Sequence, residues 1–260
     1  MRAVILAAGR GTRLRPYTTT QPKCLLPFAG QLLLERQLQT LRACGIHDVV
    51  IVAGYRADQI VAPGARVRLN ACYEETDVVG SLMSVAEDLE GDVVVCYGDI
   101  IYERRILEVL LQAPHHDLSV LMDEDWRMYY DARFGSGQHA RPGQVVSTNG
   151  CLLSTQRPAV APGEIEAQYI GLVRFGPEGC RLFRQLTRRI DQEHGPRSWR
   201  RGRAVRQAAM KDVLDLLIER RMPVHAPTVK RGWLEFDSVD DYHKAQRWHQ
   251  EGSLHRFIQL

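Results

Sequence analysis

Short runs of β-branched and other apolar residues recur along the first half of this chain and alternate with longer segments of helical periodicity. Turn-forming residues bound the runs, which cover residues 2–7, 48–53, 92–97 and 118–122. A short, continuous apolar run is typical of a strand buried on both faces of a parallel sheet. The helical segments lie near 31–43, 80–89 and 103–112. This alternation predicts an α/β fold with a doubly wound, mostly parallel sheet.

The pattern weakens between residues 123 and 166, where glycines and prolines interrupt short extended pieces. We expect a small β-rich insertion there, forming a lid over the site within one domain that spans residues 1–260. Regular elements resume with a strand near 168–175, helices near 177–193 and 208–221, a strand near 233–236 and a helix from about 239. Ser238, followed three residues later by Asp241, is a plausible start for the last helix.

Composition excludes several classes of protein. Apolar residues make up 45% of the chain, which excludes a disordered chain, and a net charge of +3 gives no indication of a nucleic-acid partner. No apolar run approaches the roughly 20 residues of a membrane span, and the first run is too short for a secretory signal. The six cysteines form no C-x-x-C pair, so reduced thiols in a cytoplasmic protein are expected. A homodimer is compatible with the sequence.

Lysine is rare in this chain. Only four of the 34 basic residues are lysine, and Lys23 is the only lysine among the first 210 residues. Genomic composition explains a general excess of arginine. However, a compact ammonium and a planar guanidinium are not interchangeable at a tight phosphate site. Lys23 is therefore a candidate functional residue.

A glycine-rich turn follows the first predicted strand, in the segment Leu6-Ala-Ala-Gly-Arg-Gly-Thr-Arg-Leu-Arg-Pro16. Glycine lets the backbone approach a ligand closely and directs N–H groups at phosphate oxygens. The turn is neither G-x-G-x-x-G nor a P-loop, because no G-K-[ST] follows it. The segment Pro22-Lys-Cys-Leu-Leu-Pro27 then adds a second cation after Arg13.

Together, these two segments resemble the signature of the sugar-nucleotidyltransferase superfamily, G-x-G-T-R-L-x-P followed by P-K-x-L-L-P, with no substitution. The resemblance implies a Rossmann-like nucleotidyltransferase fold and a requirement for Mg²⁺. It implies that Arg13 holds the β- and γ-phosphates, and that Lys23 lies beside the α-phosphate and the acceptor phosphate, both as catalytic residues. The nucleotide-binding residues would be Leu6, Ala7, Ala8, Gly9, Gly11, Thr12, Arg13, Ser81 and Gly98.

Two acidic strand ends are candidate metal ligands. Asp99 follows the predicted strand that ends near Tyr97, and Asp237 ends the segment that begins at Trp233. The resemblance implies that these two aspartates bind Mg²⁺, whose preferred ligands are hard oxygens. Glu235 alternates with Asp237 on the same strand face and is the reserve ligand. The alternatives are a turn or cap role for Asp99 and a helix cap at Asp237.

The middle of the chain resembles phosphocholine and phosphonate cytidylyltransferases. It follows their Asn…Tyr…Thr-Asn…Ser-Leu pattern from Asn70 to Leu82, except that Asp77 replaces the second Asn. The Gln-Pro-Gly-Leu-Ala stretch of hexose-1-phosphate thymidylyltransferases is absent from the sequence. The resemblance implies transfer of CMP from CTP to a small phosphonate or phosphate acceptor, with release of pyrophosphate.

The acceptor would be bound by residues of the insertion and of the strand and helix after it, namely Trp126, Arg127, Tyr129, Arg133, Gln168, Tyr169 and Lys211. A choline cation needs aromatic faces, whereas an acidic phosphonate needs cations, for which Arg141 and Arg231 are further candidates. The neighbouring cations favour a small anionic phosphonate.

Two other functions remain open. One is a thymidylyl- or uridylyltransferase for a hexose 1-phosphate. The other is a non-catalytic regulatory subunit that binds a nucleotide, although such a module has no need of Asp99 and Asp237.

Overall fold

The structure, a computed structural model, describes residues 1–113, 117–135, 144–147, 149–155 and 164–260. Its central sheet has the strand order β12 (Thr228–Val229), β8 (Leu118–Asp123), β11 (Glu164–Phe175), β6 (Val93–Tyr97), β1 (Arg2–Ala7), β4 (Asp48–Ala53) and β5 (Ala65–Leu69). Strand β11 is antiparallel to both of its neighbours in this order, and the other pairs are parallel. The predicted doubly wound, mostly parallel sheet is confirmed.

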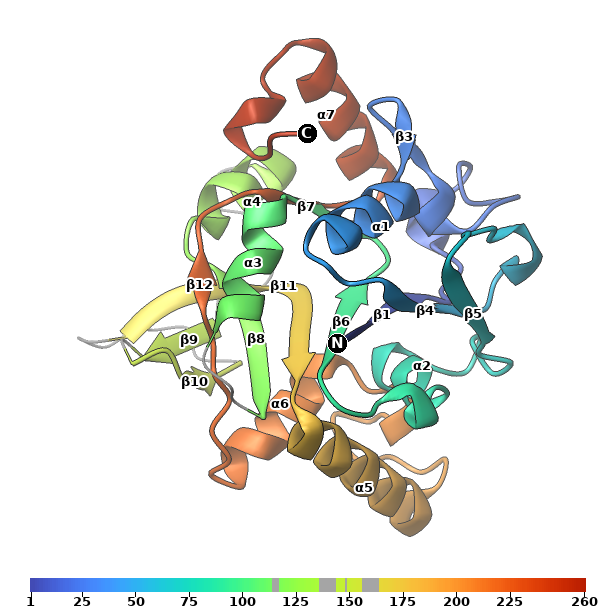
Figure 1. Cartoon of the computed structure of the whole chain (residues 1–260), viewed down its shortest axis with the longest axis vertical. Coiled ribbons are helices and arrows are strands. Elements are labelled where there is room, and N and C mark those ends of the chain that lie inside the picture. Colours follow the sequence, from blue (N-terminus) through green and yellow to red (C-terminus); the bar gives the residue numbers. More distant parts are fainter. Residues whose placement is uncertain (114–116, 136–143, 148, 156–163) are drawn as a thin grey trace.

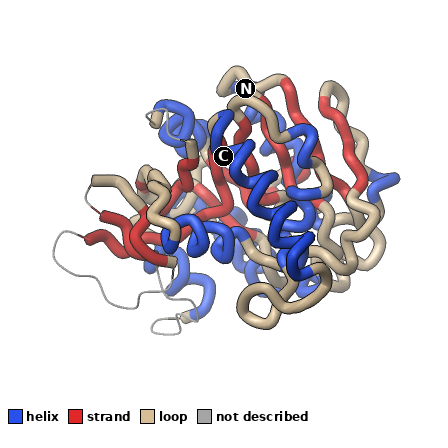
Figure 2. The backbone as a smooth tube through the Cα atoms, turned by 90° about the horizontal axis from the view of Figure 1, so that it is seen from below, coloured by secondary structure: helices blue, strands red, loops and turns tan. Residues whose placement is uncertain are grey.

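Side chains alternate between two hydrophobic cores on the two faces of the sheet. On β1, Ile5 lies in one core and Val4 in the other. The first core contains residues of α1 (Leu33–Ala43), α3 (Arg104–Gln112), α4 (Trp126–Phe134) and α7 (Val239–Gln250). The second contains residues of α2 (Val78–Met83), α5 (Pro177–His194) and α6 (Met210–Glu219). Helices therefore cover both faces (Figures 1 and 2).

The order of the parallel strands determines where a ligand can bind. From β1 the chain winds outward through β4 to β5, and it then returns to place β6 on the other side of β1. The winding direction thus reverses between β1 and β6. In open α/β sheets, ligands bind at the carboxyl ends of the strands beside such a switch point. The glycine-rich turn after Ala7 and the Gly98-Asp99 turn both lie there.

A second, two-stranded sheet joins distant parts of the chain. Strand β13 (Trp233–Glu235) pairs antiparallel with β7 (Ile100–Tyr102), so that Glu235 lies opposite Ile100. A further short hairpin joins β2 (Pro27–Phe28) to β3 (Gln31–Leu32). The pairing of β7 with β13 brings the two predicted acidic strand ends to one place.

The segment predicted as a β-rich lid differs in part from that prediction. Among its described residues, Trp126–Phe134 form helix α4, β9 (Gln144–Ser147) and β10 (Leu152–Ser154) are short strands, and β11 begins at Glu164. The buried face of α4 carries aromatic side chains and Arg133, so the usual aliphatic periodicity is missing. The residues of the predicted lid at 136–143, 148 and 156–163 lie outside the described part of the chain.

Two other elements depart from the sequence prediction. Strand β5 is missing from it because Arg66 and Arg68 interrupt its apolar run and most of the strand is exposed. The helix predicted near 80–89 is shorter, and a separate helical turn follows at Ala86–Asp88. None of the described helices is long and apolar enough to cross a membrane.

Substitution of Gly179 tests how closely α5 packs against the backbone that precedes β8. A Cβ at this position would lie 1.8 Å from the carbonyl oxygen of Asp117, a backbone atom that cannot easily move. We expect Gly179→Ala to lower the free energy of unfolding by at least about 2 kcal/mol in urea titrations. The control Arg188→Ala, at an exposed position on the same helix, should change it by less than about 0.5 kcal/mol. Equal stabilities of the two variants would contradict the packing described here.

Candidate active site

The turn after β1 folds back against Lys23. Gly11 has a left-handed backbone with φ of +59°, and its carbonyl accepts hydrogen bonds from the Thr18 hydroxyl (2.7 Å) and the Leu14 amide (2.9 Å). A Cβ on Gly11 would lie 3.2 Å from the Cβ of Lys23. The backbone conformation and the close contact both favour glycine. Gly11 thereby lets Lys23 pack directly beneath the turn.

The turn after β6 lies against the end of β1. The Gly98 amide donates to the Leu6 carbonyl at 2.9 Å, and a Cβ on Gly98 would lie only 2.6 Å from that oxygen. From α1, the buried Gln37 side chain donates to the carbonyls of Tyr97 (2.9 Å) and Ile100 (2.7 Å). These contacts hold the backbone on both sides of the turn that carries Asp99.

Three carboxylates meet where β7 and β13 pair. The Phe236 amide donates to the Asp99 carbonyl at 2.9 Å, and ligand oxygens of Asp99, Glu235 and Asp237 all lie within 4.8 Å of one another. Within the described part of the chain, Asp99 Oδ1 is buried and has no hydrogen-bond partner. An unpaired buried oxygen among hard oxygen donors suits a divalent cation. The reserve residue Glu235 belongs to the same cluster as both aspartates.

Asp237 does not cap the last helix. The Ser238 hydroxyl accepts the Asp241 amide at 3.2 Å and forms the cap, as the sequence predicts. The Asp237 carboxylate turns instead toward the turn after β1. The helix-cap alternative for Asp237 is therefore wrong.

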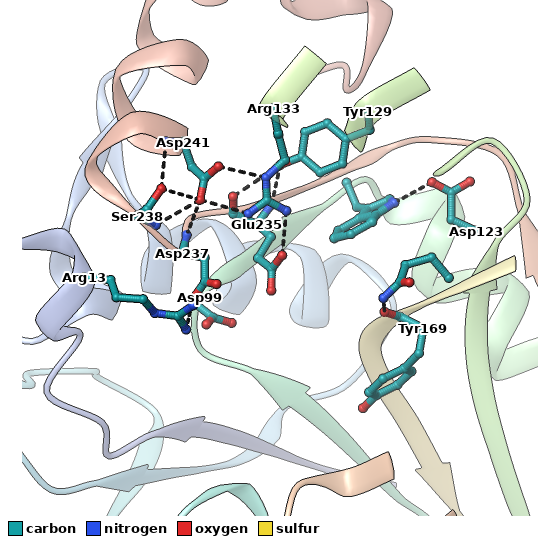
Figure 3. A network of polar contacts seen from close by, with 12 residues as sticks. Arg13, Asp99, Asp123, Tyr129, Arg133, Tyr169, Glu235, Asp237, Ser238 and Asp241 are labelled. Atoms are coloured by element: carbon teal, nitrogen blue, oxygen red, sulfur yellow. Dashed lines mark hydrogen bonds and ion pairs between the residues drawn. The ribbon is translucent and has the colours of Figure 1, made fainter. Parts of the chain in front are cut away.

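Two cations contact this acidic cluster from the side of the glycine-rich turn. Lys23 Nζ lies 2.8 Å from Asp99 Oδ2 and 3.5 Å from Asp237 Oδ1. Arg13 Nη2 lies 2.6 Å from Asp237 Oδ1 (Figure 3). Burial alone lowers the pKa of Lys23, but Asp99 and Asp237 outweigh that effect and raise the pKa above its usual value. The ammonium is therefore charged at neutral pH. When Arg133 and its two partners Glu235 and Asp241 are counted as well, four carboxylates face three cations, and the one formal negative charge that remains favours a further cation.

The predicted nucleotide-binding residues line one cavity of about 270 Å³ beside the acidic cluster. All nine take part, together with Lys23, Asp99 and Asp237; the nine are Leu6, Ala7, Ala8, Gly9, Gly11, Thr12, Arg13, Ser81 and Gly98. Tyr73 and Thr76 also line it. The structure thus brings these residues together, and their role in binding stays a prediction.

The departure at Asp77 has a local structural role. Its carboxylate accepts the Val78 amide at 2.8 Å and caps the N-terminus of α2. The side chain of Asn70 donates to the Thr76 hydroxyl (2.8 Å) and to the Ser81 hydroxyl (3.3 Å). Aspartate and asparagine are about equally good at such a cap. The substitution therefore preserves the local backbone next to Ser81.

A second cavity, also about 270 Å³, adjoins the first one, and both are lined by Val78 and Tyr97. Three of the predicted acceptor-binding residues line it: Gln168, Tyr169 and Lys211. Tyr130, Trp233 and Glu235 complete its polar and aromatic lining. Gln168 is 3% exposed, and its Oε1 has no hydrogen-bond partner among the described residues.

The other four predicted acceptor residues do not line this cavity: Trp126, Arg127, Tyr129 and Arg133. Trp126 and Tyr129 are buried in the first hydrophobic core, and Arg127 is an exposed ion-pair partner of Glu166. These side chains lie on a helix that packs against β13, and from that helix only Tyr130 lines the cavity. The expectation that these four contact the acceptor is therefore not supported by their positions.

Arg133 is committed to carboxylates within the protein. It is 2% exposed and donates to both oxygens of Asp241 and to Glu235. Burial on its own lowers the pKa of the guanidinium, but the neighbouring Tyr129 and these two carboxylates raise it above its usual value. Of the further cationic candidates, Arg231 pairs with Asp125, and Arg141 lies outside the described residues.

Sequence reasoning missed the supporting roles of Gln37 and Asp241. A signal for Gln37 was present, because an amide three residues after Leu34 falls on the apolar face of its helix. For Asp241, the capping pattern explained the residue fully and concealed its second contact with Arg133.

Comparison with known proteins places the chain in a family. Residues 3–207 match the protein family described as MobA-like NTP transferase domain, and this chain belongs to that family. It is a nucleotidyltransferase. It is 27% identical to the CTP:phosphoglutamine cytidylyltransferase of Campylobacter jejuni over 256 residues, which cover 93% of this chain and 97% of the relative. It is 31% identical to the choline-phosphate cytidylyltransferase of Streptococcus pneumoniae over 50% of this chain and 59% of the relative.

Solved structures share the fold at low sequence identity. The CTP:phosphocholine cytidylyltransferase of Streptococcus pneumoniae superposes with a TM-score of 0.66 at 19% identity, covering 95% of this chain and 97% of that one. The inositol-1-phosphate CTP transferase of T. maritima gives 0.66 at 16% identity, covering 100% of this chain and 98% of that one. These similarities support the Rossmann-like nucleotidyltransferase fold.

Substitution of Lys23 tests its predicted catalytic role directly. We expect Lys23→Arg to lower kcat on the order of 10²-fold, nearly as far as Lys23→Ala, because a bulky fork cannot replace a point charge held between Asp99 and Asp237. The assay is steady-state pyrophosphate release at saturating substrates. As a control, Lys230→Arg alters a lysine whose side chain is 65% exposed and should leave kcat unchanged. A near-normal kcat for Lys23→Arg would show that Lys23 is not needed in the transition state.

Proposed function

We propose that this protein transfers CMP from CTP to a small phosphate or phosphonate and releases pyrophosphate. The observation that carries the proposal is that the glycine-rich turn, two cations and three carboxylates meet where two cavities adjoin. The first cavity takes the nucleotide and the second takes the acceptor. Relatives named as cytidylyltransferases support CTP as the donor.

The reaction depends more on positioning the two substrates than on proton transfer. The attacking oxygen of a phosphate or phosphonate is already anionic, so no general base is required. When bound by Asp99, Asp237 and Glu235, Mg²⁺ supplies charge neutralisation at the phosphates. Arg13, whose side chain is 65% exposed, is free to exchange Asp237 for the β- and γ-phosphates. Lys23, held beneath the turn, neutralises the α-phosphate and the acceptor between which the new bond forms.

Ser81, which lines the first cavity, can donate a hydrogen bond to a nucleotide base. The Ser81 hydroxyl accepts a hydrogen bond from Asn70, so its own hydrogen remains available for another acceptor. The carbonyl oxygen of a pyrimidine is such an acceptor.

The second cavity suits a compact acceptor with a nitrogen-bearing tail. Its walls include the aromatic rings of Tyr97, Tyr130, Tyr169 and Trp233. The buried Gln168 Oε1 can accept a hydrogen bond from the acceptor substrate. Aromatic faces attract ammonium groups. Among the described residues that line this cavity, Lys211 is the one cation, so the arginines that favoured an acidic phosphonate contribute little. We therefore propose an aminated phosphonate or phosphate as the acceptor, in place of the small anionic phosphonate that the sequence favoured.

A substrate panel tests this function. Pyrophosphate release would be measured for CTP, UTP, dTTP and GTP with phosphocholine, 2-aminoethylphosphonate, phosphonoformate and glucose 1-phosphate. We expect CTP with an aminated acceptor to exceed every other pair by about 10-fold or more in kcat/KM. Preference for dTTP or UTP with glucose 1-phosphate would indicate a hexose-1-phosphate enzyme. Nucleotide binding without turnover would indicate a regulatory subunit.

The acidic cluster gives a separate prediction. Asp99→Asn and Asp237→Asn should each lower kcat on the order of 10²-fold in Mg²⁺ titrations, a loss of about 2.7 kcal/mol of transition-state stabilisation. The control Asp240→Asn, at a side chain that is 68% exposed, should leave turnover unchanged. If Asp237→Asn is active and Glu235→Gln is inactive, the metal ligand is Glu235.

A further inference from the structure

Helix α4 contacts the metal-binding strand through two buried polar side chains. The Tyr129 hydroxyl accepts the Glu235 amide at 2.9 Å and donates to the Glu235 carbonyl at 3.2 Å. One turn further along, Arg133 Nη1 donates to Glu235 Oε2 at 2.6 Å. Tyr129 and Arg133 are 3% and 2% exposed. The same helix thus holds both the backbone and the carboxylate of Glu235.

The same arginine also contacts Asp241, which lies in the first turn of α7, just after this strand. Its Nε and Nη2 donate to the two oxygens of Asp241, each at 2.9 Å. Asp241 Oδ2 in turn accepts the amides of Ser238 (2.9 Å) and Asp237 (3.3 Å). Figure 3 shows this chain of contacts from Arg133 through Asp241 to Asp237. Arg133 therefore contacts Glu235 directly and Asp237 through one intermediate residue.

The guanidinium is itself held on several sides. Its central carbon lies 4.8 to 5.6 Å from the ring centres of Tyr129, Tyr130 and Phe134. From α7, the Lys244 ammonium donates to the Arg133 carbonyl. With three N–H groups engaged and almost no exposure, Arg133 cannot swing out to a substrate. It can act on the reaction only through the carboxylates that it contacts.

We propose that Tyr129 and Arg133 are positioning residues, which hold Glu235 and Asp237 in the arrangement that binds the divalent cation. The inference rests on the proposed function, because it requires that these carboxylates bind a metal. Groups that orient metal ligands typically contribute 10- to 100-fold to metal affinity. A purely structural ion pair would instead affect stability and leave the metal affinity unchanged.

Arg174 provides a matched control. It is also 2% exposed, and it pairs with Asp92 at 3.1 Å and donates to the Leu111 carbonyl at 3.1 Å. It lies opposite Val94, so it is near the end of β6 that is remote from Asp99. Replacing either arginine by methionine removes a buried guanidinium and its ion pair, but only one of the two arginines contacts the acidic cluster.

The experiment measures Mn²⁺ binding by electron paramagnetic resonance in the presence of a non-hydrolysable CTP analogue, well below the unfolding temperature. We expect Arg133→Met and Arg133→Lys to weaken Mn²⁺ binding by about 10-fold or more, and Arg174→Met to leave it within about 2-fold of wild type. Tyr129→Phe keeps the packing and should weaken Mn²⁺ binding by about 3-fold or more. Raising Mg²⁺ should restore part of the turnover of the Arg133 variants, because the metal affinity is what they lose.

The outcomes distinguish a failure of the positioning role from a failure of the proposed function. Wild-type Mn²⁺ affinity in Tyr129→Phe and in a folded Arg133 variant would overturn the positioning role while leaving the proposed function intact. An equal loss in Arg174→Met would overturn it as well, since general destabilisation would then explain the effect. If wild-type protein binds no Mn²⁺ with the analogue, both the positioning role and the metal assignment fail.

Discussion

Mutual repulsion among three carboxylates is the constraint to which the rest of the site responds. Each pair of charges within 4.8 Å repels by about 3 kcal/mol or more in a partly buried environment. Lys23 and Arg13 offset this repulsion from the side of the glycine-rich turn, and Arg133 offsets it from α4. The cations on the two sides differ in mobility. Arg13 is largely exposed and is available to a ligand, whereas Arg133 is buried and fixed.

The elements that could be predicted from sequence are those whose environment is uniform. Strands β1, β4, β6 and β8 are buried on both faces, so their apolar runs are continuous and easy to recognise. The edge strand β5 and helix α4 were missed because exposed arginines interrupt one and aromatic residues with Arg133 form the buried face of the other. Local pattern alone does not distinguish an arginine that binds a substrate from one that neutralises a buried acid.

The residues of the site also divide into those that the fold class brings together and those that depend on a tertiary pairing. The residues of the glycine-rich turn, Lys23 and Asp99 are close in space because β1 and β6 are neighbouring parallel strands, which the fold class implies. The position of Glu235 depends on the register of β13 against β7, which is a tertiary pairing between distant segments. For this reason the sequence predicted Tyr129 and Arg133 as acceptor-binding residues, whereas the structure places them against Glu235. Their shared partner Glu235 belongs to a strand whose position could not be derived from the sequence.

The pairing of β7 with β13 also orders events during synthesis of the protein. A nascent chain that has emerged as far as α6 already contains the glycine-rich turn, Lys23 and Asp99. It lacks Glu235 and Asp237, which enter only when β13 adds to β7. All of the central sheet except β12 can therefore form beside the first cavity before the acidic cluster exists. During synthesis, the residues of β1 and β6 that line the first cavity therefore emerge before the acidic cluster is complete, and β13 is the strand that completes it.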